Sequence, residues 1–283
     1  MSKTILITGG TGFLGRRLGK AFREAGYETI LTGRNHDQNR LAADYSGCRV
    51  IPSDVANIES VRDSIAESRP EIVVHAAASK YVDTAEANPM ECIDVNVTGS
   101  QNVARAAIAA GVKTVVGIST DKSAPPVSNT YGLSKAIMER VYCAMNGKTE
   151  TKFVCVRFGN MPWSTGSVFP IWTRMIEQDG VIKSTGSHMT RLFTLAEEAV
   201  KLVNTAIDHI NEVQGDVLCR TMKAGLISDF LDVWTERKGG SWVKIEPRAG
   251  ERDYEHLIGE AELPLIVAGE LLQHIKREVA GEY

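Results

Sequence analysis

Short apolar runs alternate with helical patterns through the first half of the chain. Strand-like runs lie at 4–8, 28–32, 48–52, 71–76, 114–118 and 152–158, and helical patterns lie at 16–25, 58–67, 96–110 and 134–145. Strands separated by helices pair in parallel through right-handed crossovers. Runs that are apolar on both faces, such as ILIT, are typical of a sheet covered on both sides. The pattern therefore predicts an α/β fold with a doubly wound parallel sheet, of the Rossmann type.

The alternation becomes irregular after about residue 159. Segment 160–190 contains Pro, Gly, Ser and two Trp, and segment 195–211 is an amphipathic helical pattern. We therefore predict a dinucleotide-binding Rossmann domain at 1–160. Residues 161–283 are predicted to form a smaller C-terminal substrate-binding cap, some of whose elements return to the Rossmann sheet.

Composition and charge exclude several classes of protein. Of the 283 residues 43% are hydrophobic and 24% are charged, which is typical of a globular chain and excludes disorder. The net charge of −3 argues against nucleic acid as a partner. The five cysteines show no CxxC spacing and the histidines no metal-ligand spacing, so we expect no metal and a reducing, cytoplasmic location. No run approaches the roughly 18 apolar residues of a membrane span, and the N-terminus reads as a strand.

The first predicted strand ends in TGGTGFLG, which places three glycines at a GxxGxxG spacing. At a strand-to-helix turn, Gly9 permits the tight turn, Gly12 lets the backbone approach a pyrophosphate, and Gly15 lets the helix pack on the strand. The helix N-terminus then offers amide donors to that anion. The motif predicts a dinucleotide site; a glycine-rich turn without a ligand is the alternative reading.

The end of the second strand distinguishes NAD from NADP. An NAD site places an acidic residue there, which accepts a hydrogen bond from the ribose 2′-hydroxyl. This chain has Gly33, Arg34 and Asn35 instead. A guanidinium can pair with a 2′-phosphate, so we predict NADP. The alternative is that Arg34 is a solvated loop cation.

The sequence YGLSK places Tyr131 and Lys135 one turn apart on the same face of a predicted helix. A nearby ammonium group favours a phenolate and is expected to lower the pKa of Tyr131. Such a tyrosine can take a proton from a sugar or alcohol hydroxyl while a hydride leaves the same carbon. On its own the spacing is common in helices.

These motifs, with HAAA after the fourth strand and RFGN after the sixth, resemble the extended short-chain dehydrogenase/reductase superfamily. STDKSAPPVSNTYGLSK is similar to the nucleotide-sugar 4,6-dehydratases of surface-polysaccharide synthesis, including those that act on UDP-N-acetylglucosamine. Further similar stretches, among them EPRAGERDYEHLI, extend the resemblance over about residues 4 to 260. The resemblance implies that NADP stays bound to the enzyme through the reaction cycle. The expected cofactor-binding residues are Gly9, Thr11, Gly12, Phe13, Leu14, Gly15, Arg34, Asn35, Asp54, Val55, Ala76, Ala77, Ala78, Asn96, Ser119, Tyr131 and Lys135.

The resembled reaction implies roles for the residues beside Tyr131. Carbon 4 of the sugar is oxidised, water is lost across carbons 5 and 6, and hydride returns to carbon 6. Lys122 is the candidate base at carbon 5, Asp121 the candidate acid at carbon 6, and Thr120 a partner for the carbon-4 hydroxyl. We expect a raised pKa for Asp121 and a lowered pKa for Lys122. The alternative is a surface Asp–Lys pair.

The same resemblance supplies candidate substrate ligands: Lys80 after the fourth strand, Asn160 after the sixth strand, and Ser167, Val168, Arg191, Arg248 and Glu251 in the second half. The alternative is that the charged ones are ordinary surface residues. Trp163 and Thr165 depart from the family, which typically has Gly and often Arg there, and they bear on the hexose pocket. A homo-oligomer, dimer or hexamer, is expected through helices 96–110 and 134–145.

Three functions follow in order of preference. The first is an NADP-dependent nucleotide-sugar 4,6-dehydratase, with or without inversion at carbon 5. The second is an epimerase, reductase or other dehydratase on the same substrates, against which the adjacent Asp121 and Lys122 argue. The third is a non-catalytic NADP sensor, against which the presence of Tyr131 and Lys135 argues.

Overall fold

The computed structural model describes residues 3–259 and residue 262. Its body is a seven-stranded sheet with the order β3-β2-β1-β4-β5-β6-β9, in which all neighbouring strands pair in parallel. The strands are β1 (Thr4–Thr8), β2 (Glu28–Gly33), β3 (Arg49–Pro52), β4 (Ile72–His75), β5 (Thr114–Ile118), β6 (Lys152–Val156) and β9 (Val217–Leu218). The doubly wound α/β prediction is confirmed, and the first six strands lie where the apolar runs predict them.

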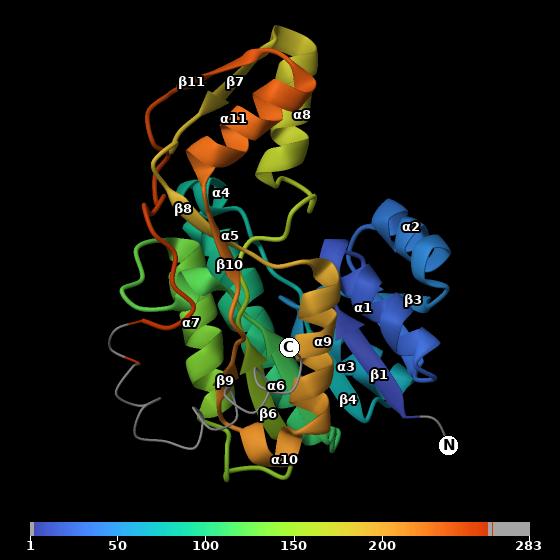
Figure 1. The fold of residues 1–283 in the computed structure, drawn as a ribbon. Helices are drawn as coiled ribbons and strands as arrows, with labels where there is room; N and C mark the ends of the chain where they lie inside the picture. The colour runs from blue at the N-terminus through green and yellow to red at the C-terminus, as the bar shows by residue number, and fades with distance from the viewer. Residues whose placement is uncertain (1–2, 260–261, 263–283) are drawn as a thin grey trace.

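Two helical layers cover the sheet (Figure 1). One contains α1 (Phe13–Glu24), α2 (His36–Ser46), α9 (Ala196–Asp208) and the short α10 (Ile210–Val213); the other contains α3 (Ile58–Ser68), α6 (Gly99–Ala109) and α7 (Thr130–Cys143). Successive strand residues face opposite layers: Ile5 and Ile7 pack in one core cluster and Leu6 in the other. Burial on both faces explains why these strands are apolar throughout.

Three local features differ from the sequence prediction. Helix α2 was not expected; Asn35 caps it by accepting a hydrogen bond from the Gln38 N–H at 3.0 Å. The predicted helix at 96–110 is a regular α-helix only from Gly99, because the turn Asp94–Thr98 has π-helical geometry. Strand β9 is the seventh strand, which the irregular pattern of the second half hid. The remaining short helices of the body are α4 (Val82–Ala87) and α5 (Pro89–Ile93).

The cap stands above the carboxyl ends of the strands (Figure 1). It contains α8 (Val168–Asp179), α11 (Ile227–Lys238) and two small sheets, β7 (Val181–Ser184) with β11 (Ser241–Lys244) and β8 (Thr190–Phe193) with β10 (Lys223–Leu226). Its own apolar core includes Trp172, Ile182 and Leu231, each at most 3% exposed. By contrast, α9 packs on β5 and β6 of the main sheet.

A buried ion pair lies beneath the loop that follows β5. Arg157, just after β6, donates to both carboxylate oxygens of Glu139 on α7, at 2.7 and 2.6 Å. Glu139 also accepts from the hydroxyl groups of Ser119 and Ser123. A fully satisfied buried carboxylate of this kind holds the loop in one position.

We predict that Glu139→Gln lowers the free energy of unfolding by about 3 kcal/mol, because Arg157 keeps only its pairing with Glu262 and two serine hydroxyl groups lose a charged acceptor in the interior. The measurement is urea denaturation. Glu59→Gln, which removes the exposed pair with Arg62, is the control and is expected to cost less than about 1 kcal/mol. Equal costs for the two variants would contradict the structural role of Glu139.

Candidate active site

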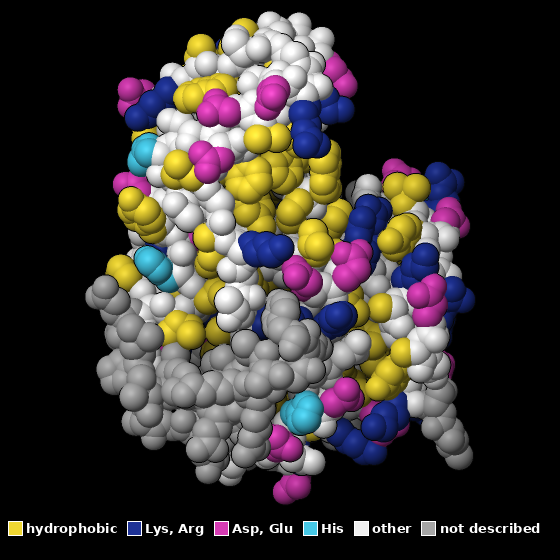
Figure 2. Space-filling model, viewed as in Figure 1, with side chains coloured by type: hydrophobic (Ala, Val, Ile, Leu, Met, Phe, Trp, Pro, Cys, Tyr) yellow, Lys and Arg dark blue, Asp and Glu magenta, His cyan; other side chains and the backbone are white. Residues whose placement is uncertain are grey.

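A cavity of about 640 Å³ lies at the carboxyl ends of the strands, between the sheet and the cap. Figure 2 shows the molecule hollowed between the cap and the part that carries α1 and α2. Fourteen of the predicted cofactor residues line the cavity: Gly9, Thr11, Gly12, Phe13, Leu14, Arg34, Asp54, Val55, Ala76, Ala77, Ala78, Ser119, Tyr131 and Lys135. Gly15, Asn35 and Asn96 lie outside the lining.

The glycine turn leaves space that side chains would fill. Gly9 has φ of +64°, and a Cβ there would lie 2.5 Å from the backbone of Ala77. A Cβ on Gly12 would meet only the Gly9 carbonyl, at 3.3 Å, so this position is open towards the cavity. A Cβ on Gly15 would lie 2.4 Å from the same carbonyl, so this glycine lets α1 pack on the turn. The turn therefore fits the pyrophosphate of a dinucleotide.

The end of β2 carries no acidic residue. Gly33 ends the strand, and the exposed Arg34 guanidinium lies in the cavity wall, 3.5 Å from the Glu91 carboxylate. Asn35 is engaged as the cap of α2. An exposed cation at this place can approach a 2′-phosphate.

Asn96 shapes the cavity from behind its wall. Its side chain is fully buried in the π-helical turn, where it accepts from the Ser79 N–H at 2.8 Å and donates to the Ser79 carbonyl at 2.9 Å. It also donates to the Ser134 hydroxyl at 2.9 Å. Asn96 thus ties the segment after β4 to the helix that carries Tyr131 and Lys135.

Tyr131 and Lys135 lie in the first two turns of α7 and both line the cavity. Burial lowers the pKa of Lys135 to about 8, and its ammonium lies 3.1 Å from the Met138 sulfur. Burial raises the pKa of Tyr131 to about 12. The expected lowering is therefore wrong: desolvation outweighs the nearby charges, and the ammonium group that opposes it most is Lys122 rather than Lys135.

Asp121 and Lys122 form a short 3-10 turn (Asp121–Ser123) directly after β5. Thr120 Oγ1 donates to Asp121 Oδ1 at 2.8 Å, and Lys122 Nζ donates to the same oxygen at 3.1 Å. Burial raises the pKa of Asp121 to about 6, against the opposing effect of Lys122 and with help from the Glu255 carboxylate. The predicted raised pKa of this acid is confirmed.

Lys122 lies at the cavity wall with 17% of its side chain exposed. Its ammonium contacts Asp121 Oδ1, Glu255 Oε1 at 2.8 Å and Asn160 Oδ1 at 3.2 Å. Burial alone would lower the pKa of Lys122, but the two carboxyl groups outweigh burial and raise it. The expected lowered pKa is therefore wrong, because the attraction of the ammonium group to Asp121 and Glu255 is stronger than the effect of burial.

Glu255 is the functional candidate that the sequence did not reveal. It lies in the stretch EPRAGERDYEHLI, within which only Arg248 and Glu251 are sequence predictions. No local pattern separates Glu255 from the other acidic residues there, because its partner lies in a loop after β5. Its presence in a family-like stretch was the only available signal.

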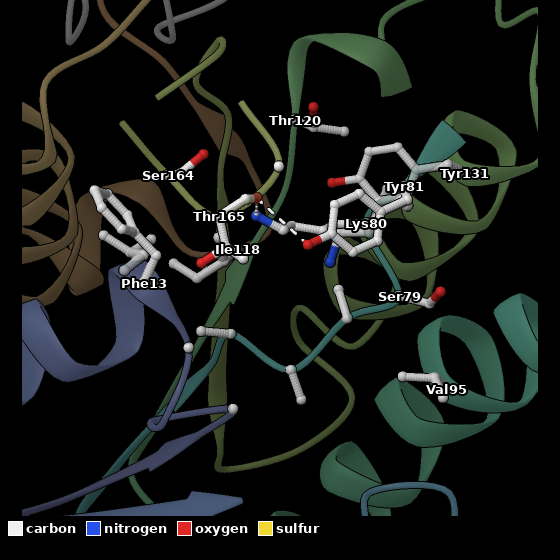
Figure 3. Close-up of a pocket in the computed structure, with 18 of the residues that line it drawn as sticks. Phe13, Ser79, Lys80, Tyr81, Val95, Ile118, Thr120, Tyr131, Ser164 and Thr165 are labelled. Carbon is white, nitrogen blue, oxygen red and sulfur yellow. Dashed lines mark hydrogen bonds between the residues drawn. The ribbon is translucent and has the colours of Figure 1, made fainter. Parts of the chain in front are cut away.

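The predicted substrate residues divide between two cavities. Lys80 lines the large one and donates to the Thr165 carbonyl at 2.7 Å across it (Figure 3). Asn160 and Ser167 line both the large cavity and a neighbouring one of about 180 Å³. The smaller cavity is also lined by Val168, Arg191, Arg248 and Glu251.

Trp163 lines neither cavity. It has φ of +65°, a backbone conformation unusual for a residue with a side chain. Its ring, part of a residue that is 56% exposed, packs against Phe169 and Trp234 of the cap. Thr165, the second departure from the family, contributes its backbone carbonyl to the bridge with Lys80. Among the described residues, no group of three or more His, Cys, Asp or Glu could hold a metal ion, and no helix is long and apolar enough to cross a membrane.

The fold, the glycine turn and the Tyr–Lys pair define a nucleotide-sugar-modifying enzyme of the extended short-chain dehydrogenase/reductase type. The chain belongs to the family described as polysaccharide biosynthesis protein, whose model matches residues 5–265. UDP-glucose 4-epimerase of Rickettsia typhi is 34% identical over 276 residues, covering 93% of this chain and 80% of that protein.

Solved structures agree with this assignment. Pen from Bacillus thuringiensis superposes with a TM-score of 0.87 and 29% identity, covering 92% of this chain and 82% of that one. The dTDP-glucose 4,6-dehydratase of Streptomyces venezuelae, solved with NAD bound, has a TM-score of 0.80, 19% identity and coverage of 92% and 90%. At that identity the second likeness concerns the fold alone.

The raised pKa of Asp121 predicts a pH-dependent stability. The group has a pKa of 3.8 unfolded and about 6 folded, so the folded state loses stabilisation as the pH rises from about 4 through 6. Asp121→Asn has no carboxyl group to ionise and escapes this loss. Over that pH range we expect the free energy of unfolding of the variant to increase relative to that of the unmutated protein, by on the order of 2–3 kcal/mol.

The measurement is the free energy of unfolding of both proteins in urea at several pH values. The difference between them should become constant above the folded pKa. A difference that does not change between pH 4 and 7 would show that Asp121 is already ionised at pH 4.

Proposed function

We propose that this chain is an NADP-dependent nucleotide-sugar 4,6-dehydratase that acts on UDP-N-acetylglucosamine or a similar nucleotide hexosamine. The observation that carries the proposal is the acid–base pair Asp121 and Lys122 beside Tyr131. Asp121 has a pKa near neutrality, and Lys122 lies in the wall of the same cavity as Tyr131. An epimerase that only removes and returns a hydride at carbon 4 needs no such second pair.

Bound in the large cavity, the dinucleotide supplies the hydride acceptor for carbon 4 and the hydride donor for carbon 6. The chain supplies the proton transfers. Tyr131, in the wall with Thr120, takes the proton of the carbon-4 hydroxyl as that carbon is oxidised. The new ketone acidifies the carbon-5 proton, which Lys122 removes in its neutral amine form. The electrons form the carbon 5–carbon 6 double bond, and the carbon-6 hydroxyl leaves as water with the proton of Asp121.

The two cavities support a division of binding between the halves of the chain. Residues 1–160 line most of the large cavity, which we assign to the cofactor and to the hexose beside Tyr131 and Lys122, and residues between 161 and 251 line most of the smaller cavity. The smaller cavity, with two arginines in its wall, suits the diphosphate and nucleoside, because a guanidinium pairs with phosphate in bidentate geometry. The predicted substrate-binding region runs to residue 283, and its residues 260, 261 and 263–283 lie outside the part of the chain that the structure describes.

The remaining parts of the proposal have individual support. Leu133 and Ile137, 51% and 45% exposed on α7, support a homo-oligomer formed through α6 and α7. A cytoplasmic location stays a prediction from cysteine usage.

A 4-epimerase is the second candidate function, favoured by the name of the Rickettsia typhi relative. The two candidates differ in one observable, the release of water. A dehydratase converts UDP-N-acetylglucosamine to a 4-keto product lighter by one water, whereas an epimerase leaves the mass unchanged.

We predict that the purified protein with NADP converts UDP-N-acetylglucosamine to the 4-keto product. In heavy water this product carries deuterium at carbon 5. Lys122→Ala and Asp121→Asn are expected to retain the oxidation at carbon 4, seen as reduced cofactor by absorbance, and to release water roughly 100-fold more slowly or worse. Mass spectrometry of the product is the measurement.

Lys113→Ala, which removes an ammonium group that is 73% exposed and paired with Glu71, is the control and should keep the full rate. Unchanged dehydration in both site variants would remove the pair from the mechanism. Epimerised product without loss of water would establish the second candidate.

The missing acid after β2 predicts the cofactor preference. Arg34→Glu is expected to bind NADP roughly 10- to 100-fold more weakly, because a charge-assisted bond to the 2′-phosphate becomes a repulsion. Its affinity for NAD should stay the same or rise. Binding titrations with both dinucleotides provide the measurement. Arg40→Glu, on the exposed face of α2 outside the cavity lining, is the matched control; tighter binding of NAD than NADP by the unmutated protein would contradict the prediction.

A further inference from the structure

Glu255 is a carboxylate that lies outside the large cavity and contacts the proposed base, Lys122, directly. Glu255 has a side chain only 3% exposed and does not line the large cavity. It lies in the segment that follows β11 and runs past β8 towards α7 (Figure 1). The Thr190 N–H donates to the Asp253 carbonyl at 3.0 Å and anchors this segment to β8.

The contacts of Glu255 converge on Lys122. Oε1 lies 2.8 Å from Lys122 Nζ and 3.6 Å from Arg191 Nε. Oε2 accepts from Asn160 Nδ2 at 2.6 Å, and the other side of the same amide accepts from Lys122 Nζ at 3.2 Å. Lys122, Asn160 and Glu255 therefore form a closed ring of contacts, which leaves the ammonium group little freedom to move.

The charges around Glu255 come from two elements. Arg191 on β8 and Lys122 on the 3-10 turn are cations, and Asp121 on the same turn is the neighbouring acid; Asn160 is neutral. The two cations lower the pKa of Glu255 to about 2 although burial raises it. Glu255 is thus a fixed negative charge, and it raises the pKa of both Asp121 and Lys122.

We propose that Glu255 is a positioning residue for the elimination step: it holds the Lys122 ammonium group at the cavity wall and, through its charge, sets the pH range in which the Asp121–Lys122 pair acts. This inference rests on the proposed function. Glu255 acts through Lys122 and does not itself meet the sugar. Its role differs from that of the other glutamates of the segment, since Glu251 binds Thr185 and Glu262 binds Arg157.

The proposal predicts the direction of a pH shift. Elimination needs Asp121 protonated and Lys122 neutral at the same time. The fraction of enzyme in that state rises with pH up to the pKa of Asp121, is level up to the pKa of Lys122, and falls above it. Removing a nearby negative charge lowers both pKa values, so both limbs of the profile move to lower pH.

The test compares three variants of the full chain with the unmutated enzyme. Glu255→Gln keeps the size and loses the charge. The lower limb of its dehydration profile is expected to move down from about pH 6 by roughly one unit or more. Glu255→Asp keeps the charge with a shorter side chain and should keep the profile while losing rate. Glu262→Gln is the control: it weakens the contact of the same segment with Arg157 and should lower stability without moving either limb.

A second readout needs no substrate. The titration of the Asp121 carboxyl, followed by NMR of protein with ¹³C-labelled aspartate and assigned with Asp121→Asn, should have a lower midpoint in Glu255→Gln than in the unmutated protein. An enzyme that dehydrates but whose profile and Asp121 midpoint are the same with and without the Glu255 charge contradicts the proposed role alone. An unmutated enzyme that releases no water contradicts the proposed function and this role with it, even where the Asp121 midpoint moves.

Discussion

In a parallel sheet the carboxyl ends of all strands lie at the same edge, and the cavity of this protein depends on that constraint. The glycine turn follows β1, Arg34 follows β2, the alanine run follows β4, and the Asp–Lys turn follows β5. Each arrives at the cavity because its strand ends there. The helices on both faces then leave this edge as the place where a ligand of mixed polarity can enter.

Burial of charge is the second condition for the site. Below the loop, Arg157 donates to Glu139. The same carboxylate accepts hydrogen bonds from Ser119, which precedes the Asp–Lys turn, and from Ser123, which ends it. Above it, Glu255 and Asn160 surround the ammonium of Lys122. The turn is therefore fixed from both sides, and its acid and its cation remain at defined distances although both lie almost out of contact with water.

Local signals in the sequence predicted the sheet and the cofactor side of the cavity. A strand that is apolar on both faces, a glycine that must lack a Cβ, and a tyrosine one turn from a lysine are all recognisable within about ten residues. Helix α2 was missed because its buried face consists of Asn39, Ala42 and Ser46, which give no apolar period. Glu255 was missed because only the tertiary fold brings its segment to Lys122. The direction of the Lys122 pKa was wrong because the adjacent Asp121 and the distant Glu255 together outweigh burial.

The contact between Lys122 and Glu255 also has a consequence for synthesis. The glycine turn, the Asp–Lys turn and Tyr131 all lie in the first half of the chain and leave the ribosome early. Glu255 emerges only after the whole cap has been made. A nascent or truncated chain that ends before this residue carries the cofactor loop and the proton-transfer residues, yet it lacks the carboxylate that fixes the lysine. Because translation runs from the N-terminus, the residue that positions Lys122 is synthesised after all the residues that carry out the proton transfers.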